Sequence, residues 1–207
     1  MQKIVSFILL YNMLGLRVKG RSVTVLELIQ QLDEQALRWI AQFVRQEWLN
    51  PLVIVYTSLG NAGLCFIGVA LFLLFFRKTR EGGATALTAM GLGLLVTNLT
   101  VKPLLTRPRP WVAMEDFVPL VTSSDPHSFP SGHTTAAFAF GVALFFTLPQ
   151  KWAKAAALTA AALMGLSRLY VGVHFPTDVL AGMVIGTCCG LLARWLVLRI
   201  KERFLRQ

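Results

Sequence analysis

The chain has 207 residues, of which 55% are hydrophobic and only 14% are charged. A soluble globular chain usually carries about 25% charged residues, so this composition argues against a soluble domain and favours a protein that crosses a membrane several times. The formal net charge is +10, but the Lys and Arg residues cluster at the ends of apolar runs. We therefore expect membrane topology and an anionic substrate, and no nucleic-acid partner.

The N-terminal region is predicted to lie on the membrane surface. Residues 4–16 are apolar but too short to span a bilayer comfortably, and they lack the cleavage site of a good signal peptide. Residues 26–44 place apolar side chains at helical spacing, with Glu27, Asp33 and Glu34 among the polar positions. This pattern predicts an amphipathic helix in the interface. A sixth membrane segment at the N-terminus remains an alternative.

Five apolar runs follow, each close to the roughly 20 residues that a membrane-spanning helix needs. They cover residues 51–76, 83–101, 131–149, 151–170 and 179–198. The predicted fold class is therefore all-α: a polytopic membrane helix bundle with five, or six, transmembrane helices and an N-terminal amphipathic interfacial helix. We expect a single membrane-embedded domain over residues 1–207, with an interfacial region at 1–48 and a transmembrane core at 51–200.

The connections between these runs alternate between two sides of the membrane. The loops at residues 77–80 and 149–154 and the C-terminus carry most of the Lys and Arg residues. By the positive-inside rule this side is cytoplasmic. The polar motifs fall on the other side, so we expect the chemistry to face the extracytoplasmic space. Arg17, Lys19 and Arg21 argue mildly against an N-terminal helix on that outer side.

Polar residues at membrane ends are costly and usually functional, and here they form three clusters. The first is Lys102-x6-Arg109-Pro110. Two fixed cations make a phosphate clamp, because Arg binds oxygens bidentately and Lys supplies a point charge. Prolines in and around this stretch favour a bend over a continuous helix. Taken alone, the cluster is more simply explained as the interfacial anchor of a helix end.

The second cluster is Pro130-Ser131-Gly132-His133, which opens an apolar run. The N-terminus of a helix offers unpaired N–H groups and a positive dipole end, which suit a phosphate. Ser131 could cap the helix, Gly132 would let the backbone approach a ligand closely, and His133 could protonate a leaving oxygen. An ordinary N-cap beside an interfacial histidine is the alternative.

The third cluster is Ser167-Arg168-x5-His174-x3-Asp178. His174 and Asp178 are four residues apart, so one helical turn would bring them to the same face. A carboxylate beside one imidazole nitrogen fixes the tautomer and raises the basicity of the other nitrogen. Arg168 adds a third cation. The alternative, a salt bridge at a helix end, is a poor explanation for three ionisable residues between two apolar helices.

The three clusters resemble the three-part signature of the type 2 phosphatidic acid phosphatase family of membrane enzymes, whose core is similar to that of vanadium haloperoxidases. The resemblance covers residues 102–178 and includes every specified position. It implies a lipid phosphatase in which His174 is the nucleophile that forms a phosphohistidine, Asp178 orients it and His133 is the acid. It also implies that the phosphoryl oxygens are held by Lys102, Arg109, Ser131, Gly132 and Arg168. No metal or other cofactor is implied.

The family resemblance implies a lipid phosphate substrate that enters from the bilayer. Residues 107–113 and 129–135 look similar to bacterial undecaprenyl-diphosphate phosphatases, so our first expectation is hydrolysis of undecaprenyl diphosphate to undecaprenyl phosphate in cell wall biogenesis. The alternatives are a phosphatidylglycerophosphate or phosphatidic acid phosphatase, a lipid phosphotransferase, and a non-enzymatic lipid-phosphate-binding or transport protein. The sequence leaves the oligomeric state open.

Two further charged residues of the segment 102–130 carry weaker signals. Arg107 could assist a second phosphate, but anchoring of the helix end is the simpler role. Asp125 could shape the entrance of the site or be an ordinary solvated loop residue.

Overall fold

The computed structural model describes residues 15–18 and 21–205. It begins with the antiparallel strands β1 (Gly15–Val18) and β2 (Arg21–Thr24). All later elements are helical: α2 (Val25–Trp39), η1 (Ile40–Val44), α3 (Asn50–Ser58), η2 (Asn61–Gly63), α4 (Leu64–Leu74), α5 (Arg80–Leu94), η3 (Leu95–Val101), α6 (Lys102–Leu104), α7 (Pro110–Ala113), α8 (Gly132–Thr147), α9 (Lys151–Tyr170) and α10 (Pro176–Leu205). The bundle is all-α, and within the described ranges the hairpin is the only sheet. The interpretation of residues 4–16 falls almost entirely outside the described residues.

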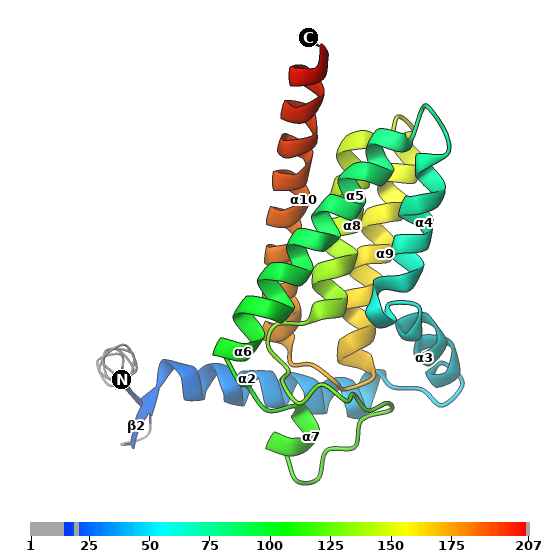
Figure 1. Cartoon of the computed structure of the whole chain (residues 1–207). Coiled ribbons are helices and arrows are strands. Elements are labelled where there is room, and N and C mark those ends of the chain that lie inside the picture. The colour runs from blue at the N-terminus through cyan, green and yellow to red at the C-terminus, as the bar shows by residue number, and fades with distance from the viewer. Residues whose placement is uncertain (1–14, 19–20, 206–207) are drawn as a thin grey trace.

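Helices α4, α5, α8, α9 and α10 run side by side as a bundle, and α2 lies across one end of it (Figure 1). The segment from α6 to α8 and the turn between α9 and α10 lie at this same end. The α4–α5 and α8–α9 connections lie at the opposite end, together with the C-terminal end of α10. The connections therefore alternate between two ends, and the segments that carry the three motifs meet beside α2.

Small residues bring α8 and α10 close together in the centre of the bundle. Gly182, Gly186 and Gly190 recur every fourth residue along α10 and face α8. A Cβ added at Gly186 would lie 2.5 Å from the carbonyl oxygen of Thr135. A larger residue would push the two helices apart, which is why small residues at this spacing favour close helix packing in membranes.

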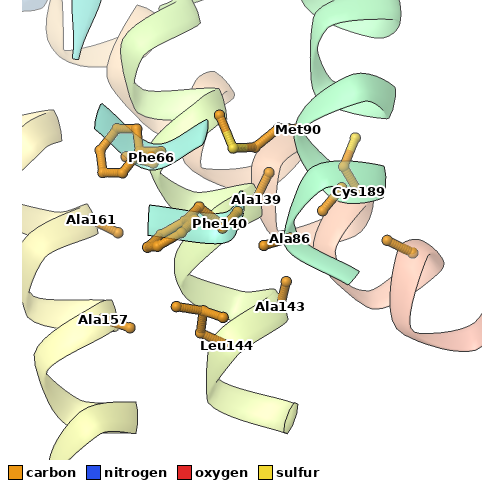
Figure 2. Packing of buried hydrophobic residues seen from close by; sticks show 14 of the residues in the cluster. Phe66, Ala86, Met90, Ala139, Phe140, Ala143, Leu144, Ala157, Ala161 and Cys189 are labelled. Atoms are coloured by element: carbon orange, nitrogen blue, oxygen red, sulfur yellow. The ribbon is translucent and has the colours of Figure 1, made fainter. Parts of the chain in front are cut away.

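Aromatic and alanine side chains fill the rest of the core. Figure 2 shows Phe66 of α4 against Phe140 of α8, and their ring centroids are 5.2 Å apart. Ala157 and Ala161 of α9 are buried in the same cluster. The packing holds α8 between the other helices and so fixes the position of its N-terminus, which carries the second motif.

The apolar run at residues 51–76, predicted as one uninterrupted span, is broken in the structure. Helices α3 and α4 meet at a bend of 49°. Ala62 and Gly63 have positive φ angles of 51° and 68°, a left-handed conformation that cannot continue a right-handed helix. Composition hid the break because the run contains no charge. The bend brings Gly60 against the His133 ring, where an added Cβ would lie 2.7 Å from Cδ2.

The other predicted runs correspond to helices of similar extent. Helix α9 has the predicted bounds, and α8 lies within the run predicted at 131–149. By length and composition, Arg80–Leu104 and Pro176–Arg203 can cross a membrane, and the bent α3–α4 pair makes a third candidate. Helix α8 is apolar but shorter. The protein is thus a membrane protein with several helical spans.

The amphipathic helix predicted at residues 26–44 is present as α2 and η1. Thr24 caps it through a reciprocal pair of bonds with Glu27, a capping box. Leu37 is fully buried in a cluster with Phe117 and Phe175, on the side that faces the bundle. On other sides large apolar side chains stay exposed, among them Leu26, Leu32, Trp39 and Phe43. One face therefore docks on the bundle while apolar surface remains for a bilayer interface.

Candidate active site

The three motifs converge on one cavity of about 670 Å³ at the end of the bundle beside α2. Six of the eight predicted site residues line it: Lys102, Arg109, Gly132, His133, Arg168 and His174. The other two, Ser131 and Asp178, are fully buried next to lining residues. The clusters that the sequence places up to 76 positions apart, at Lys102 and Asp178, thus form a single site.

Three buried cations dominate the electrostatics of this cavity. Lys102, Arg109 and Arg168 are 7%, 2% and 5% exposed. Among the described residues that line the cavity, Asp125 is the one carboxylate facing them. It bonds to Lys102 and lies 3.5 Å from Nη2 of Arg109. Because buried charge is costly without a partner, an excess of buried cations indicates a site built for an anion.

Arg168 is the cation that no carboxylate neutralises within the described part of the chain. Its Nη1 donates to Oγ1 of Thr57 at 2.7 Å, and its buried Nε has no hydrogen-bond partner there. Helix α9 carries Arg168 in its last turn, at the end of the bundle where the side chain lines the cavity. An oxyanion in the cavity would give this guanidinium its missing acceptor.

The N-terminus of α8 supplies the second group of donors. Ser131 is the N-cap, as predicted, and its Oγ accepts from the backbone N–H of Thr134 at 3.4 Å. An α-helix leaves its first N–H groups without intrahelical acceptors, and Gly132, the first helical residue, lines the cavity without a side chain. The backbone N–H of Ser131 donates to the carbonyl oxygen of Asp178 at 3.0 Å, which ties α8 to α10.

His174 lies between a cation and a carboxylate. Its Nε2 is 3.1 Å from Nη1 of Arg109, and its Nδ1 is 3.6 Å from Oδ2 of Asp178. A guanidinium can only donate, so Nε2 must present its lone pair and Nδ1 must carry the proton. The 3.6 Å separation is too long for a hydrogen bond. The structure therefore brings the predicted pair together in the right orientation, at a distance slightly greater than a bond requires.

Asp178 is held by two donors of its own. Its Oδ2 accepts from the backbone N–H of Phe175 at 2.8 Å, as in one half of a capping box at the start of α10. Its Oδ1 accepts from Nη1 of Arg107 at 2.7 Å. The sequence interpretation gave Arg107 an anchoring role and missed this contact.

Residues 82–202 match the PAP2 superfamily, a span that contains all eight predicted site residues. The chain belongs to the PAP2 superfamily. It is 34% identical to phosphatidylglycerophosphatase B of Bacillus subtilis over an alignment of 216 positions, gaps included, that covers 98% of each chain. It is 30% identical to an undecaprenyl-diphosphatase of Sulfolobus acidocaldarius over 145 residues, or 70% of this chain and 69% of the relative.

Solved structures agree with this assignment. The crystal structure of a transmembrane PAP2-type phosphatidylglycerolphosphate phosphatase from Bacillus subtilis superposes with a TM-score of 0.66 at 32% identity, covering 98% of both chains. A bacterial vanadium-dependent iodoperoxidase shares the fold, with a TM-score of 0.63 at 14% identity over 86% of this chain and 51% of its own. The protein is a PAP2 lipid phosphatase, as the motifs predicted, and the non-enzymatic alternative is not favoured.

Sequence reasoning missed two polar residues of this PAP2 site. The Oδ1 atom of Asn61 lies 3.0 Å from Nε2 of His133, and Thr57 contacts Arg168. Both belong to the broken α3–α4 segment. The signal that could have found them is their polarity within an otherwise apolar membrane run.

Asp125 occupies a more central position in the PAP2 site than a solvated loop residue would. Burial opposes its ionisation, but the hydrogen bonds from Lys102 and from the backbone of His127, together with the nearby cations, hold the pKa of Asp125 below its usual value. The ionised carboxylate therefore contacts two of the cations predicted to bind phosphate. If Lys102 and Arg109 bind the phosphate as predicted, Asp125 competes with it for both cations.

Proposed function

We propose that this PAP2 phosphatase hydrolyses a lipid phosphate through a phosphohistidine on His174, with no metal ion. The observation that carries the proposal is a buried imidazole that presents its Nε2 lone pair in a cavity lined by three cations. Burial, and then the cations of Arg109, Arg168 and Lys102, lower the pKa of His174 well below its usual value. The nucleophile is consequently neutral at physiological pH.

In the first step Nε2 of His174 attacks phosphorus, and the bond from phosphorus to the lipid oxygen breaks. The three cations and the N-terminus of α8 stabilise the charge that spreads over the phosphoryl oxygens. Asp178 stabilises the proton on Nδ1 as the imidazole becomes positive. His133 gives its proton to the departing lipid oxygen. It must take up this proton when the anionic substrate binds, because burial and the cations that keep His174 neutral also oppose a positive charge on His133 in the free enzyme.

In the second step water replaces the histidine. Neutral His133 accepts a proton from the water molecule, whose oxygen attacks phosphorus as the bond from phosphorus to Nε2 breaks. Inorganic phosphate leaves, His174 returns to its neutral form and His133 is again protonated. A lipid hydroxyl in place of water would give phosphotransfer, which is the alternative outcome of the same intermediate.

The shape of the cavity supports an amphiphilic substrate. Its polar end holds the cations, and its lining continues onto apolar residues of α4 and α5, including Ile67, Leu87 and Met90. A phosphate head group at the cations would leave its lipid chain between these helices, facing the bilayer. A soluble phosphate ester would gain nothing from the apolar part.

For the lipid itself we rank phosphatidylglycerol phosphate first and undecaprenyl diphosphate second, with phosphatidic acid as a further alternative. The sequence motifs alone favoured undecaprenyl diphosphate. The likeness to phosphatidylglycerophosphatase B, however, extends over 98% of the chain and so includes α2, whereas the likeness to the undecaprenyl-diphosphatase covers 70%. This difference in coverage supports the changed order.

We further propose that the α3–α4 pair, α5–α6, α8, α9 and α10 form five membrane spans of a single domain over residues 1–207. Residues 1–48 form its interfacial region, 51–200 its transmembrane core, and 102–178 carry the catalytic motifs. The end of the bundle opposite the cavity carries Arg77 and Lys78 in the α4–α5 connection and Lys151 at the start of α9. The positive-inside rule would put that end in the cytoplasm and the cavity at the extracytoplasmic face.

Phosphate release from the three lipids by detergent-purified protein, with EDTA present, tests the proposal. We expect vanadate to inhibit phosphate release and His174→Ala to abolish it. The loop variant His127→Ala should release phosphate like the wild type. The ranking of kcat/KM identifies the substrate. Activity in His174→Ala would contradict the phosphohistidine mechanism. Activity that is lost in EDTA and restored by magnesium would contradict a mechanism without metal.

A further inference from the structure

Arg107 joins two buried carboxylates that come from opposite parts of the chain. Its Nη1 donates to Oδ1 of Asp178 at 2.7 Å, and its Nη2 donates to Oδ2 of Asp33 at 2.6 Å. Asp33 belongs to α2 and is 3% exposed, while Asp178 is fully buried. The planar guanidinium suits this arrangement because its separate N–H groups can serve two acceptors at once.

Asp33 also holds the first turn of α10 directly. Its Oδ1 accepts from the backbone N–H of Thr177 at 3.0 Å, and its Oδ2 accepts from the Thr177 hydroxyl. Thr177 is the second residue of α10, where backbone N–H groups lack intrahelical acceptors. Asp33 thus caps α10 from another helix, one residue before Asp178.

None of Asp33, Arg107 and Thr177 belongs to the cavity lining. They therefore lie outside the proposed substrate site, and the direct contact between this group and the proposed catalytic pair is the hydrogen bond from Arg107 to Asp178. Arg107 also stacks on the ring of Phe175, with its Cζ 4.2 Å from the ring centroid. Phe175 lies in the sequence between His174 and the first residue of α10. The network fixes Oδ1 of Asp178 and so leaves Oδ2 directed toward Nδ1 of His174.

We propose that Asp33 and Arg107 are positioning residues for the Asp178–His174 pair, so that the N-terminal helix α2 is a working part of the catalytic apparatus. The inference rests on the proposed function, in which Asp178 orients the nucleophile. Without the network Oδ1 of Asp178 loses its charged donor, and the backbone N–H of Phe175 is left to hold the carboxylate through Oδ2. The gap to His174 already measures 3.6 Å, and displacement of a catalytic group by about 1 Å can lower a rate on the order of a hundredfold.

Asp33→Asn tests the link, with Glu115→Gln, at an exposed position outside the network, as the control that also removes one negative charge. We expect Asp33→Asn to lower kcat by about tenfold or more, with KM and the vanadate inhibition constant nearly unchanged because Lys102, Arg109 and Arg168 are untouched. Glu115→Gln should match the wild type. A parallel fall in kcat, vanadate affinity and Tm would indicate a structural role only and overturn the proposal.

If Asp33→Asn does not yield folded protein, Arg107→Lys tests the same link, because Lys keeps the charge but cannot bridge both carboxylates as a fork does. The same selective loss of kcat is expected. His174→Ala is assayed under the same conditions. If it is inactive while either folded variant keeps the wild-type kcat, the positioning role is overturned and the phosphatase mechanism stands. Activity in His174→Ala would instead overturn the mechanism itself.

Discussion

Nε2 of His174 lies 3.1 Å from Nη1 of Arg109, and the same guanidinium nitrogen donates to the carbonyl oxygen of Val173 at 2.9 Å. The guanidinium is fixed in place and stays charged, so a proton on Nε2 would face a cation at hydrogen-bond distance. The contact therefore favours the neutral imidazole, in agreement with the lowered pKa of His174. The proposed nucleophile and a cation proposed to bind the phosphate are thus held side by side.

The pH dependence of activity should reflect this contact. His174 must be neutral to attack, so a lowered pKa means that activity is lost only when the pH falls well below about 6.5, the ordinary value for histidine. The substrate phosphate itself loses a proton near pH 6. After correction for that ionisation, we expect kcat/KM to stay high as the pH falls through about 6.5. Arg109→Gln removes a cation and should move the acid limb to higher pH. An acid limb at or above 6.5 in the wild type would contradict this prediction.

Asp125 should weaken the binding of anions to the free enzyme. Its ionised carboxylate bonds to Lys102 and faces Arg109, where a phosphate is proposed to bind. Asp125→Asn removes the competing charge, and because Asp125 is 36% exposed the gain in vanadate affinity should be modest, about two- to fivefold. Asp116→Asn, in the same loop, is the control and should change nothing. Weaker vanadate inhibition in Asp125→Asn would show instead that the carboxylate supports the site.

Asn61 should affect the departure of the leaving group. It contacts Nε2 of His133 at 3.0 Å and so orients the proposed acid. We expect Asn61→Ala to slow hydrolysis of an alkyl lipid phosphate by about tenfold or more, and to slow an aryl phosphate much less, because an aryl oxide leaves without a proton. His133→Ala should show the same dependence more strongly. Equal losses on both substrates would remove Asn61 from this role.

The sequence was most informative where local chemistry decides structure. The bounds of α9 follow from Pro149 before it and the turn at Gly172 after it, and Ser131 caps α8 as its residue type predicts. All three motifs were recognisable because a cavity for phosphate needs cations and histidines, which stand out in apolar surroundings. Residue type and spacing were enough to identify these elements.

Tertiary packing decided the rest. The bend at Ala62 depends on backbone angles that an apolar run does not reveal, so the first span was predicted as continuous. Likewise, Asp33 was one polar position of an amphipathic helix, and nothing in its neighbours indicated Arg107 as its partner 74 positions away. Contacts of this kind arise only when α2 docks across the end of the bundle.

The close packing of α8 and α10 makes a prediction about stability. A Cβ at Gly186 would lie 2.5 Å from the carbonyl oxygen of Thr135 and 2.8 Å from Cβ of Phe138. Backbone cannot yield as a flexible side chain can, so Gly186→Ala should cost about 1–3 kcal/mol of stability by overpacking. The loss should appear as a lower Tm of the purified protein in detergent.

Gly68→Ala is the matched control for this experiment. Gly68 lies in α4, where an added Cβ would meet nothing within 4 Å, and alanine favours a helix over glycine by about 1 kcal/mol. Its Tm should therefore equal or exceed that of the wild type, although both substitutions make the same chemical change. If Gly186→Ala were as stable as Gly68→Ala, the α8–α10 contact would be looser than described, and the N-terminus of α8 would not be held by the glycine spacing of α10.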